Sequence, residues 1–117
     1  MAVHSPAPKA LRMRRLPGFS LPARFISSSS TGRVAEDVDF YVLHQANMRI
    51  LEGVRTRLKV DAARFPHNIE RTGNTSSATV PVLLDELNRS GKLKPGAHLI
   101  LNAFGAGLCT ATALVKW

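Results

Sequence analysis

The sequence predicts an α/β domain, with a mixed β-sheet and two main helices in the order β-α-β-α-β-β, preceded by a disordered basic tail. Short apolar runs rich in β-forming residues alternate with stretches in which apolar residues recur at helical spacing. Such alternation is typical of helices packed on a sheet. The last two apolar runs flank a glycine turn, whereas residues 1–33 keep neither period for long.

The regular part of the chain begins near residue 36. Val38–Leu43 is a short run of β-forming residues, which predicts a buried strand. In Asn47–Leu58 apolar residues recur every three or four positions, which predicts an amphipathic helix. A second short strand is expected around Pro66–Glu70.

A second helix is expected over Val80–Asn88, where an apolar stripe recurs at helical spacing. Ser76 or Ser77 can cap its start, and Gly91 is a suitable stop signal. The remaining predicted elements are a turn at Lys94–Gly96 and two strands, at His98–Phe104 and Thr110–Trp117.

The net charge of +8 on the 117 residues is unevenly placed. Residues 1–33 contain six Lys or Arg and no acid, whereas residues 34–117 contain ten basic and eight acidic residues. A nearly balanced body with few aromatic residues argues against nucleic-acid binding. No apolar run is long enough to cross a bilayer, so no membrane partner is expected.

Residues 1–35 form the predicted tail, with four of the seven prolines and the serine run Ser27–Ser30. Organellar transit peptides share this composition, being rich in Arg and Ser and poor in acids. A disordered extension, or translated sequence outside the fold, is the simpler alternative. The expected location is the cytoplasm, or a plastid or mitochondrion if residues 1–33 are a transit peptide.

Cysteine and histidine are sparse in this chain. The single cysteine, Cys109, excludes an internal disulfide. The four histidines are scattered and lack the paired spacing of zinc ligands, so no metal site is predicted; they are His4, His44, His67 and His98.

Two polar residues are candidates for a functional site. His44 lies where the first predicted strand ends, and an imidazole there can donate a hydrogen bond to a carbonyl or transfer a proton. A structural histidine is the alternative. Asn74 follows Gly73 in a turn before the second helix, and its amide is a neutral donor suited to an oxyanion. An ordinary Gly-Asn turn is the alternative there.

A glycine turn and a basic helix carry weaker signals. The turn at Gly105–Gly107 can present a backbone N–H to an oxyanion, or simply form a tight hairpin. Cys109 behind it is expected to be a small core residue rather than a nucleophile. On the first helix, Arg49 is one turn from His44 and can meet a phosphate or an acidic partner. The other helix cations, Arg55, Arg57 and Lys59, are expected to be solvated.

In combination, three motifs resemble β-ketoacyl-acyl-carrier-protein synthase III. The motifs are His44-Gln45-Ala46-Asn47-x-Arg49-Ile50, Asn68-Ile69-Glu70-Arg71-x-Gly73-Asn74-Thr75-Ser76 and Phe104-Gly105-x-Gly107-Leu108. They occur in the family order, with family-like spacing, over residues 36–117. The resemblance implies that residues 36–117 form the C-terminal half of a thiolase fold.

The resemblance also implies a condensing acyltransferase that initiates fatty-acid synthesis. In that family, a cysteine of the N-terminal half accepts an acyl group from acyl-coenzyme A, and malonyl-acyl-carrier protein then decarboxylates to an enolate that attacks it. His44 and Asn74 match the family's His and Asn, which bond the malonyl thioester carbonyl and stabilise the enolate.

Two further groups of residues match family features. Phe104, Gly105, Ala106 and Gly107 match the loop that borders the active-site tunnel, with Ala106 supplying an oxyanion N–H. The region that contacts the carrier protein or its phosphopantetheine is matched by Gln45, Ala46, Asn47 and Arg49. Coenzyme A and phosphopantetheine thioesters are implied as substrates, with no permanently bound cofactor. The implied partners are an acyl carrier protein, and a missing N-terminal half or a homodimer partner.

No residue of this chain matches the family's nucleophilic cysteine, and Cys109 stands elsewhere. One hypothesis is that the chain supplies His44 and Asn74 while another polypeptide supplies the cysteine. The other is a non-catalytic half-domain that binds a carrier protein or a thiolase-fold partner. Alone, the chain is expected to decarboxylate malonyl thioester very weakly, and to expose apolar surface and associate.

Overall fold

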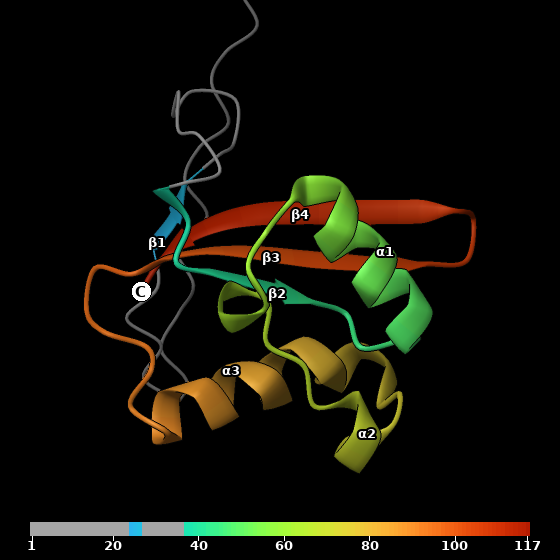
Figure 1. The fold of residues 1–117 in the computed structure, drawn as a ribbon, viewed down its shortest axis with the longest axis horizontal. Coiled ribbons are helices and arrows are strands. Elements are labelled where there is room, and N and C mark those ends of the chain that lie inside the picture. Colours follow the sequence, from blue (N-terminus) through green and yellow to red (C-terminus); the bar gives the residue numbers. More distant parts are fainter. Residues whose placement is uncertain (1–23, 27–36) are drawn as a thin grey trace, which may run out of the picture.

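A four-stranded mixed sheet is the centre of the computed structural model, which describes residues 24–26 and 37–117. The strands are Arg24–Ile26 (β1), Phe40–Leu43 (β2), His98–Gly105 (β3) and Cys109–Lys116 (β4), in the spatial order β1-β4-β3-β2. β2 runs parallel to β3, and the other two pairs are antiparallel. The predicted mixed α/β sheet is confirmed (Figure 1). Apart from β1, the predicted tail lies outside the described residues.

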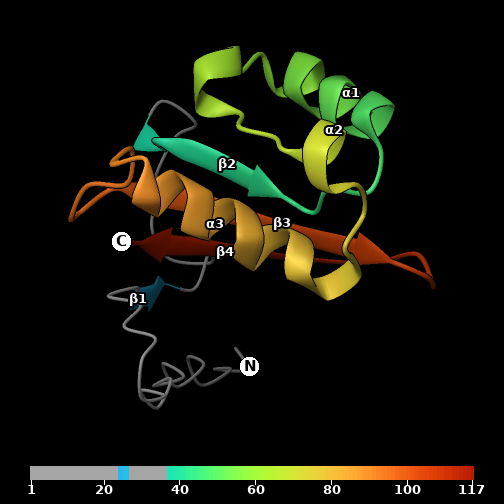
Figure 2. The same cartoon turned by 90° about the horizontal axis from the view of Figure 1, so that it is seen from below.

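Two main helices cover opposite faces of the sheet, as Figure 2 shows. They are Met48–Leu58 (α1) and Thr79–Arg89 (α3), which confirms both predicted helices. Shorter elements are the 3₁₀ turns Ala62–Arg64 (η2) and Ser76–Ala78 (η3) and the helix Ile69–Thr72 (α2). Among the described residues, no helix has the length and apolar character needed to span a bilayer.

Strand β2 separates two apolar clusters, because successive side chains of a strand point to opposite faces. Val42 is completely buried and packs in one cluster with Leu83 of α3. Its neighbours Tyr41 and Leu43 belong to the other cluster, together with Leu51 of α1. The sheet is therefore the middle layer of three.

The predicted signals after the second helix are confirmed in detail. Gly91 adopts a φ of 70° directly after α3, and the N–H of Lys92 donates to the carbonyl of Leu87 at 3.0 Å. This is the Schellman arrangement, in which glycine takes the left-handed position. Gly96 also has a positive φ, of 92°, at the third position of a turn that begins at Lys94, which suits a type II turn.

The predicted strand at Pro66–Glu70 is wrong, because Ile69–Thr72 forms helix α2 instead. The carbonyl of Asn68 accepts the N–H of Arg71 at 2.9 Å and so starts a helical turn. Pro66 has no N–H, and the N–H of Asn68 donates to the side chain of Gln45 at 3.1 Å. A strand here would need backbone N–H donors for a sheet, but Pro66 has none and the N–H of Asn68 is already bonded to Gln45.

The predicted caps of the second helix, Ser76 and Ser77, are also wrong. Both residues belong to η3, which continues directly into α3, and Ala78 holds the cap position of α3. The backbone N–H of Ser76 donates to the side chain of Asn74 at 2.9 Å. Asn74 therefore supports the start of this turn, which moves the capping role upstream of the predicted serines.

Candidate active site

The candidate site forms where β2 and β3 end. Both strands run in the same direction, so their carboxyl ends meet at one edge of the sheet, where ligands bind in α/β folds. His44 follows β2, and its backbone N–H donates to the carbonyl of Asn102 in β3 at 2.8 Å. The rings of His44 and Phe104 meet edge to face, with centroids 5.2 Å apart. Two residues 60 positions apart in the sequence are thereby neighbours.

An open cavity of about 570 Å³ lies at this edge. Its walls come from three segments: the end of β2, the turn before α3, and the β3–β4 hairpin. The lining residues are His44, Asn74, Ser76, Ser77, Ala103, Phe104, Gly105, Cys109, Thr110 and Ala111. Both predicted catalytic residues, His44 and Asn74, are among them.

His44 is held through one nitrogen of its ring. Nδ1 lies 2.5 Å from Oγ1 of Thr79, the first residue of α3. Thr79 is only 2% exposed, and its hydroxyl is also 3.1 Å from the carbonyl oxygen of Ser76. Because Nδ1 is occupied by this partly buried contact, Nε2 is the ring nitrogen left for a molecule in the cavity.

Asn74 is presented by a backbone conformation that only glycine adopts freely. Gly73 has φ 65° and ψ −162°, a combination that is essentially restricted to glycine. The next residue, Asn74, uses its side-chain oxygen to accept the N–H of Ser76 at 2.9 Å. That bond leaves the NH₂ half of the amide as the donor available to a ligand. Gly73 thus has the positive φ that the sequence suggested.

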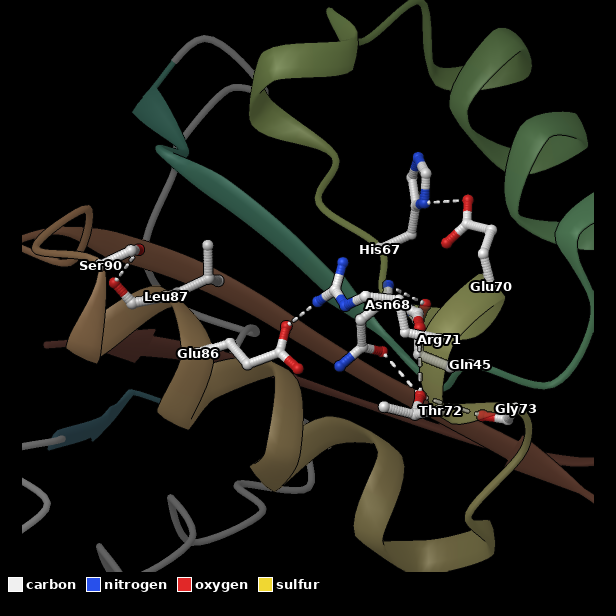
Figure 3. A network of polar contacts seen from close by, with 10 residues as sticks. All are labelled: Gln45, His67, Asn68, Glu70, Arg71, Thr72, Gly73, Glu86, Leu87 and Ser90. Atoms are coloured by element: carbon white, nitrogen blue, oxygen red, sulfur yellow. Dashed lines mark hydrogen bonds and ion pairs between the residues drawn. The ribbon is translucent and has the colours of Figure 1, made fainter.

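Gln45 has a structural position, in contrast to the expected contact with a carrier protein. Its side chain is completely buried and donates to the carbonyl of Leu43 at 2.8 Å. It also accepts the N–H of Asn68 at 3.1 Å (Figure 3). Both ends of the amide are therefore used inside the protein. Gln45 links the end of β2, which precedes His44, to the segment that leads to Asn74.

Helix α2 is further tied to α3 by an ion pair. Arg71 donates to the carboxylate of Glu86 at 2.6 Å, and His67 lies 2.8 Å from Glu70 on the outer side (Figure 3). Hydrogen bonds from its own backbone N–H and from His67 hold the pKa of the Glu70 carboxyl below its usual value. Together with Gln45, these contacts restrain the short helix that positions Gly73.

Two of the four residues predicted for the tunnel loop line the cavity. Phe104 and Gly105 line the cavity, whereas Ala106 and Gly107 are exposed in the hairpin turn and are not among its lining residues. Gly107 has φ 131°, and a Cβ on it would lie 2.7 Å from Sγ of Cys109. The backbone conformation favours glycine at this position, and a Cβ there would also force the Cys109 thiol to move.

Cys109 is exposed and lines the cavity, so the expectation of a core cysteine is wrong. It begins β4, and the first four residues of this strand are exposed on both faces of the sheet. The composition of a strand does not reveal whether another element packs on its end. The role of Thr79 was also missed, because its contact with His44 spans 35 positions and has no local sequence signal.

Arg49 and Arg55 of α1 have different surroundings. Arg49 is exposed in the first turn, where its backbone N–H donates to the side chain of Asn47, the helix cap, at 2.8 Å. Arg55 instead pairs with Glu52 at 2.9 Å. Among the described residues, no three His, Cys, Asp or Glu side chains lie close enough together to hold a metal ion.

Comparison with known proteins decides the family. The model of the 3-oxoacyl-[acyl-carrier-protein] synthase III C terminal matches residues 29–117. The chain belongs to this family. It is 44% identical over 82 residues to β-ketoacyl-[acyl-carrier-protein] synthase III of Pyropia yezoensis, covering 70% of this chain and 25% of that protein. It is 45% identical over 86 residues to the chloroplastic synthase III of Arabidopsis thaliana, covering 74% of this chain and 21% of that protein.

Solved structures of synthase III agree with this assignment. The crystal structure of the Thermus thermophilus enzyme superposes with a TM-score of 0.68 at 43% identity, over 70% of this chain and 26% of that chain. The resemblance stated from the motifs is confirmed, and with it the thiolase-like fold of the C-terminal part. The chain spans about a quarter of the length of the relatives it matches.

Proposed function

We propose that this chain supplies the enolate-stabilising part of a synthase III active site, in which His44 and Asn74 bond the carbonyl oxygen of a malonyl thioester. The observation that carries the proposal is the shared cavity, which both residues line from segments 30 positions apart. Each residue is anchored through one polar atom, by Thr79 for His44 and by Ser76 for Asn74. The other polar atom of each side chain remains for the substrate.

The proposed chemistry follows from where charge develops. When malonyl thioester loses carbon dioxide, the electron pair of the broken C–C bond becomes an enolate, whose negative charge lies largely on the thioester oxygen. Two anchored donors at that oxygen stabilise the transition state more than the ground state. The N-terminal end of α3, which Ser76 and Ser77 lead into at the cavity wall, adds a favourable positive dipole end.

The condensation step requires an acyl-cysteine from a part of the enzyme outside this chain. The enolate carbon would attack the acyl carbonyl, and the cysteine thiolate would leave as the 3-ketoacyl thioester forms. We propose an acyl carrier protein as the partner that delivers the malonyl group, and coenzyme A thioesters as the acyl source. Exposed Arg49, with Asn47 and Ala46 before it, is the proposed contact for the acidic carrier or its phosphopantetheine.

A chimeric enzyme tests this proposal. Residues 36–117 would replace the matching C-terminal segment of the Thermus thermophilus synthase III, which retains its own cysteine segment. We expect condensation with malonyl-carrier protein, and a loss of ~10²-fold or more in rate for His44→Ala and for Asn74→Ala. Asn88→Ala, at the far end of α3, is the matched control and should leave the rate unchanged.

The alternative of a non-catalytic binding module makes a different prediction. A chimera that folds, accepts the acyl group on its cysteine and still fails to decarboxylate malonyl thioester would favour that alternative. For the isolated chain we expect carbon dioxide release close to the uncatalysed rate, because the chain spans about a quarter of the synthases it matches. Clear release by the isolated chain, abolished by Asn74→Ala, would show that this cavity suffices alone.

A further inference from the structure

We infer that Thr79 is a positioning residue that determines which nitrogen of His44 carries the proton. Its hydroxyl donates to Nδ1 of His44, so the neutral imidazole keeps its own proton on Nε2, the nitrogen left for the cavity. The role of the proton on Nε2 rests on the proposed function of His44. The contact between Thr79 and His44 is independent of any substrate.

The Thr79 hydroxyl has one proton and two acceptors within reach, Nδ1 of His44 at 2.5 Å and the carbonyl oxygen of Ser76 at 3.1 Å. Hydrogen bonds from a hydroxyl group to an oxygen are typically 2.5–3.0 Å long, with about 2.7 Å the commonest value. The contact with the carbonyl oxygen of Ser76 lies beyond that range, whereas the contact with Nδ1 is 0.6 Å shorter. Nδ1 is therefore the stronger acceptor for this proton.

Burial prevents other partners from changing this choice. Thr79 is 2% exposed at the start of α3, so bulk water does not compete for its hydroxyl. The imidazole is confined as well, because Phe104 meets it edge to face and the His44 backbone N–H is bonded to Asn102 of β3. These two restraints keep Nδ1 against the hydroxyl.

The choice of tautomer matters for the chemistry. A neutral imidazole has one donor and one acceptor nitrogen, so an accepting Nδ1 leaves a donating Nε2. That Nε2–H can bond a thioester carbonyl without prior protonation of the ring. The opposite tautomer would turn a lone pair toward the carbonyl oxygen and repel the charge that develops there.

The test is a direct measurement of the tautomer in the complete 117-residue chain. Two-bond ¹H–¹⁵N correlation spectra of the ¹⁵N-labelled protein would be recorded at about pH 8.5, well above the ordinary imidazole pKa of about 6.5. A His44→Asn variant identifies the signals of His44 among the four histidines. We expect the pattern of an Nε2–H imidazole in the wild-type chain. A wild-type spectrum of the Nδ1–H form would overturn the inference.

Two variants of Thr79 separate positioning from packing. Thr79→Ser keeps the hydroxyl and should retain the wild-type Nδ1 resonance, whereas Thr79→Val keeps the shape and should move that resonance to the value of an imidazole nitrogen without an O–H partner. An unchanged Nδ1 resonance in a folded Thr79→Val protein would contradict the inference. The wild-type spectrum remains decisive if this variant does not fold.

The two proposals can fail separately. An Nε2–H tautomer in a protein whose chimera does not decarboxylate malonyl thioester would support the role of Thr79 and overturn the proposed function. An active chimera together with an Nδ1–H tautomer would do the reverse.

Discussion

The side-chain oxygen of Asn74 accepts the backbone N–H of Ser76 at 2.9 Å, so the turn that carries Asn74 also orients its amide. An N–H can be bonded only by the oxygen end of the amide, which leaves the NH₂ group as the donor for a ligand. Asn74 is exposed and lines the cavity with His44. One side chain therefore combines a structural bond with a donor for the reaction, and substitutions can separate the two.

Asn74→Asp should keep the structural bond and lose the donor. The aspartate oxygen can still accept the N–H of Ser76, but the NH₂ group is replaced by a negatively charged oxygen. We expect a loss of ~10²-fold or more in the condensation rate of the chimera, with little change in its unfolding free energy. Asn74→Ala should lose both properties. A chimera that keeps its rate with Asp at this position would show that the amide donates nothing.

Gly73→Ala should destabilise the chain although it creates no clash. No atom lies within 4 Å of a Cβ built on Gly73, but its φ of 65° and ψ of −162° suit only glycine. Such backbone strain costs about 1–3 kcal/mol of unfolding free energy. Urea denaturation measures the change. The matched control is Gly53→Ala at an exposed position of α1, also without a neighbour within 4 Å, which should stabilise the protein by about 0.5–1 kcal/mol.

Gln45→Leu should destabilise the buried link between β2 and α2. The substitution leaves the carbonyl of Leu43 and the N–H of Asn68 without the side-chain partners they have in the wild type. Each buried group left unsatisfied costs about 1–3 kcal/mol, so we expect a loss of at least that size in unfolding free energy. Thr56→Ala on the exposed side of α1 is the control, expected within about 0.5 kcal/mol. Equal stability of the two variants would remove the proposed role of Gln45.

Leu108→Ser should reduce self-association of the isolated chain. Leu108 is 86% exposed at the tip of the β3–β4 hairpin, and Ile50 and Leu58 of α1 are about half exposed, at 45% and 48%. Exposed apolar side chains favour association. Sedimentation at several protein concentrations would measure the effect, with Ala106→Ser in the same turn as the control. A wild-type chain that stays monomeric at all concentrations would contradict this expectation.

The Glu70 carboxyl should titrate below its usual range. A hydrogen bond from its own backbone N–H and one from His67 stabilise the charged form, which lowers the pKa in the folded state relative to the unfolded state. The resulting stabilisation is present above the unfolded-state pKa and is lost as the pH falls through the folded-state pKa. Carboxyl ¹³C NMR measures the titration directly. His67→Ala should raise the Glu70 pKa toward its ordinary value, and an unchanged titration would exclude this bond.

Much of the regular structure was predictable because its signals are local. The stripe of α3 is confirmed, with Leu83, Leu84 and Leu87 buried against the sheet. The glycine after α3 and the Lys-Pro-Gly turn also took their predicted conformations, because a positive φ is a property of one or two residues. The segment at Pro66–Glu70 was predicted wrongly, since a short segment does not reveal which partners its backbone groups will find.

The sequence alone determined the family, the two main helices, the strands before and after them, and the two residues proposed for the chemistry, because motif spacing and apolar periodicity are properties of the chain itself. Only the tertiary structure decided that Thr79 meets His44, that Gln45 is buried and that Cys109 is exposed. The physical reason is that burial and long-range hydrogen bonds depend on which segment covers which face of the sheet. That cover is supplied by residues distant in sequence, and no local pattern records it.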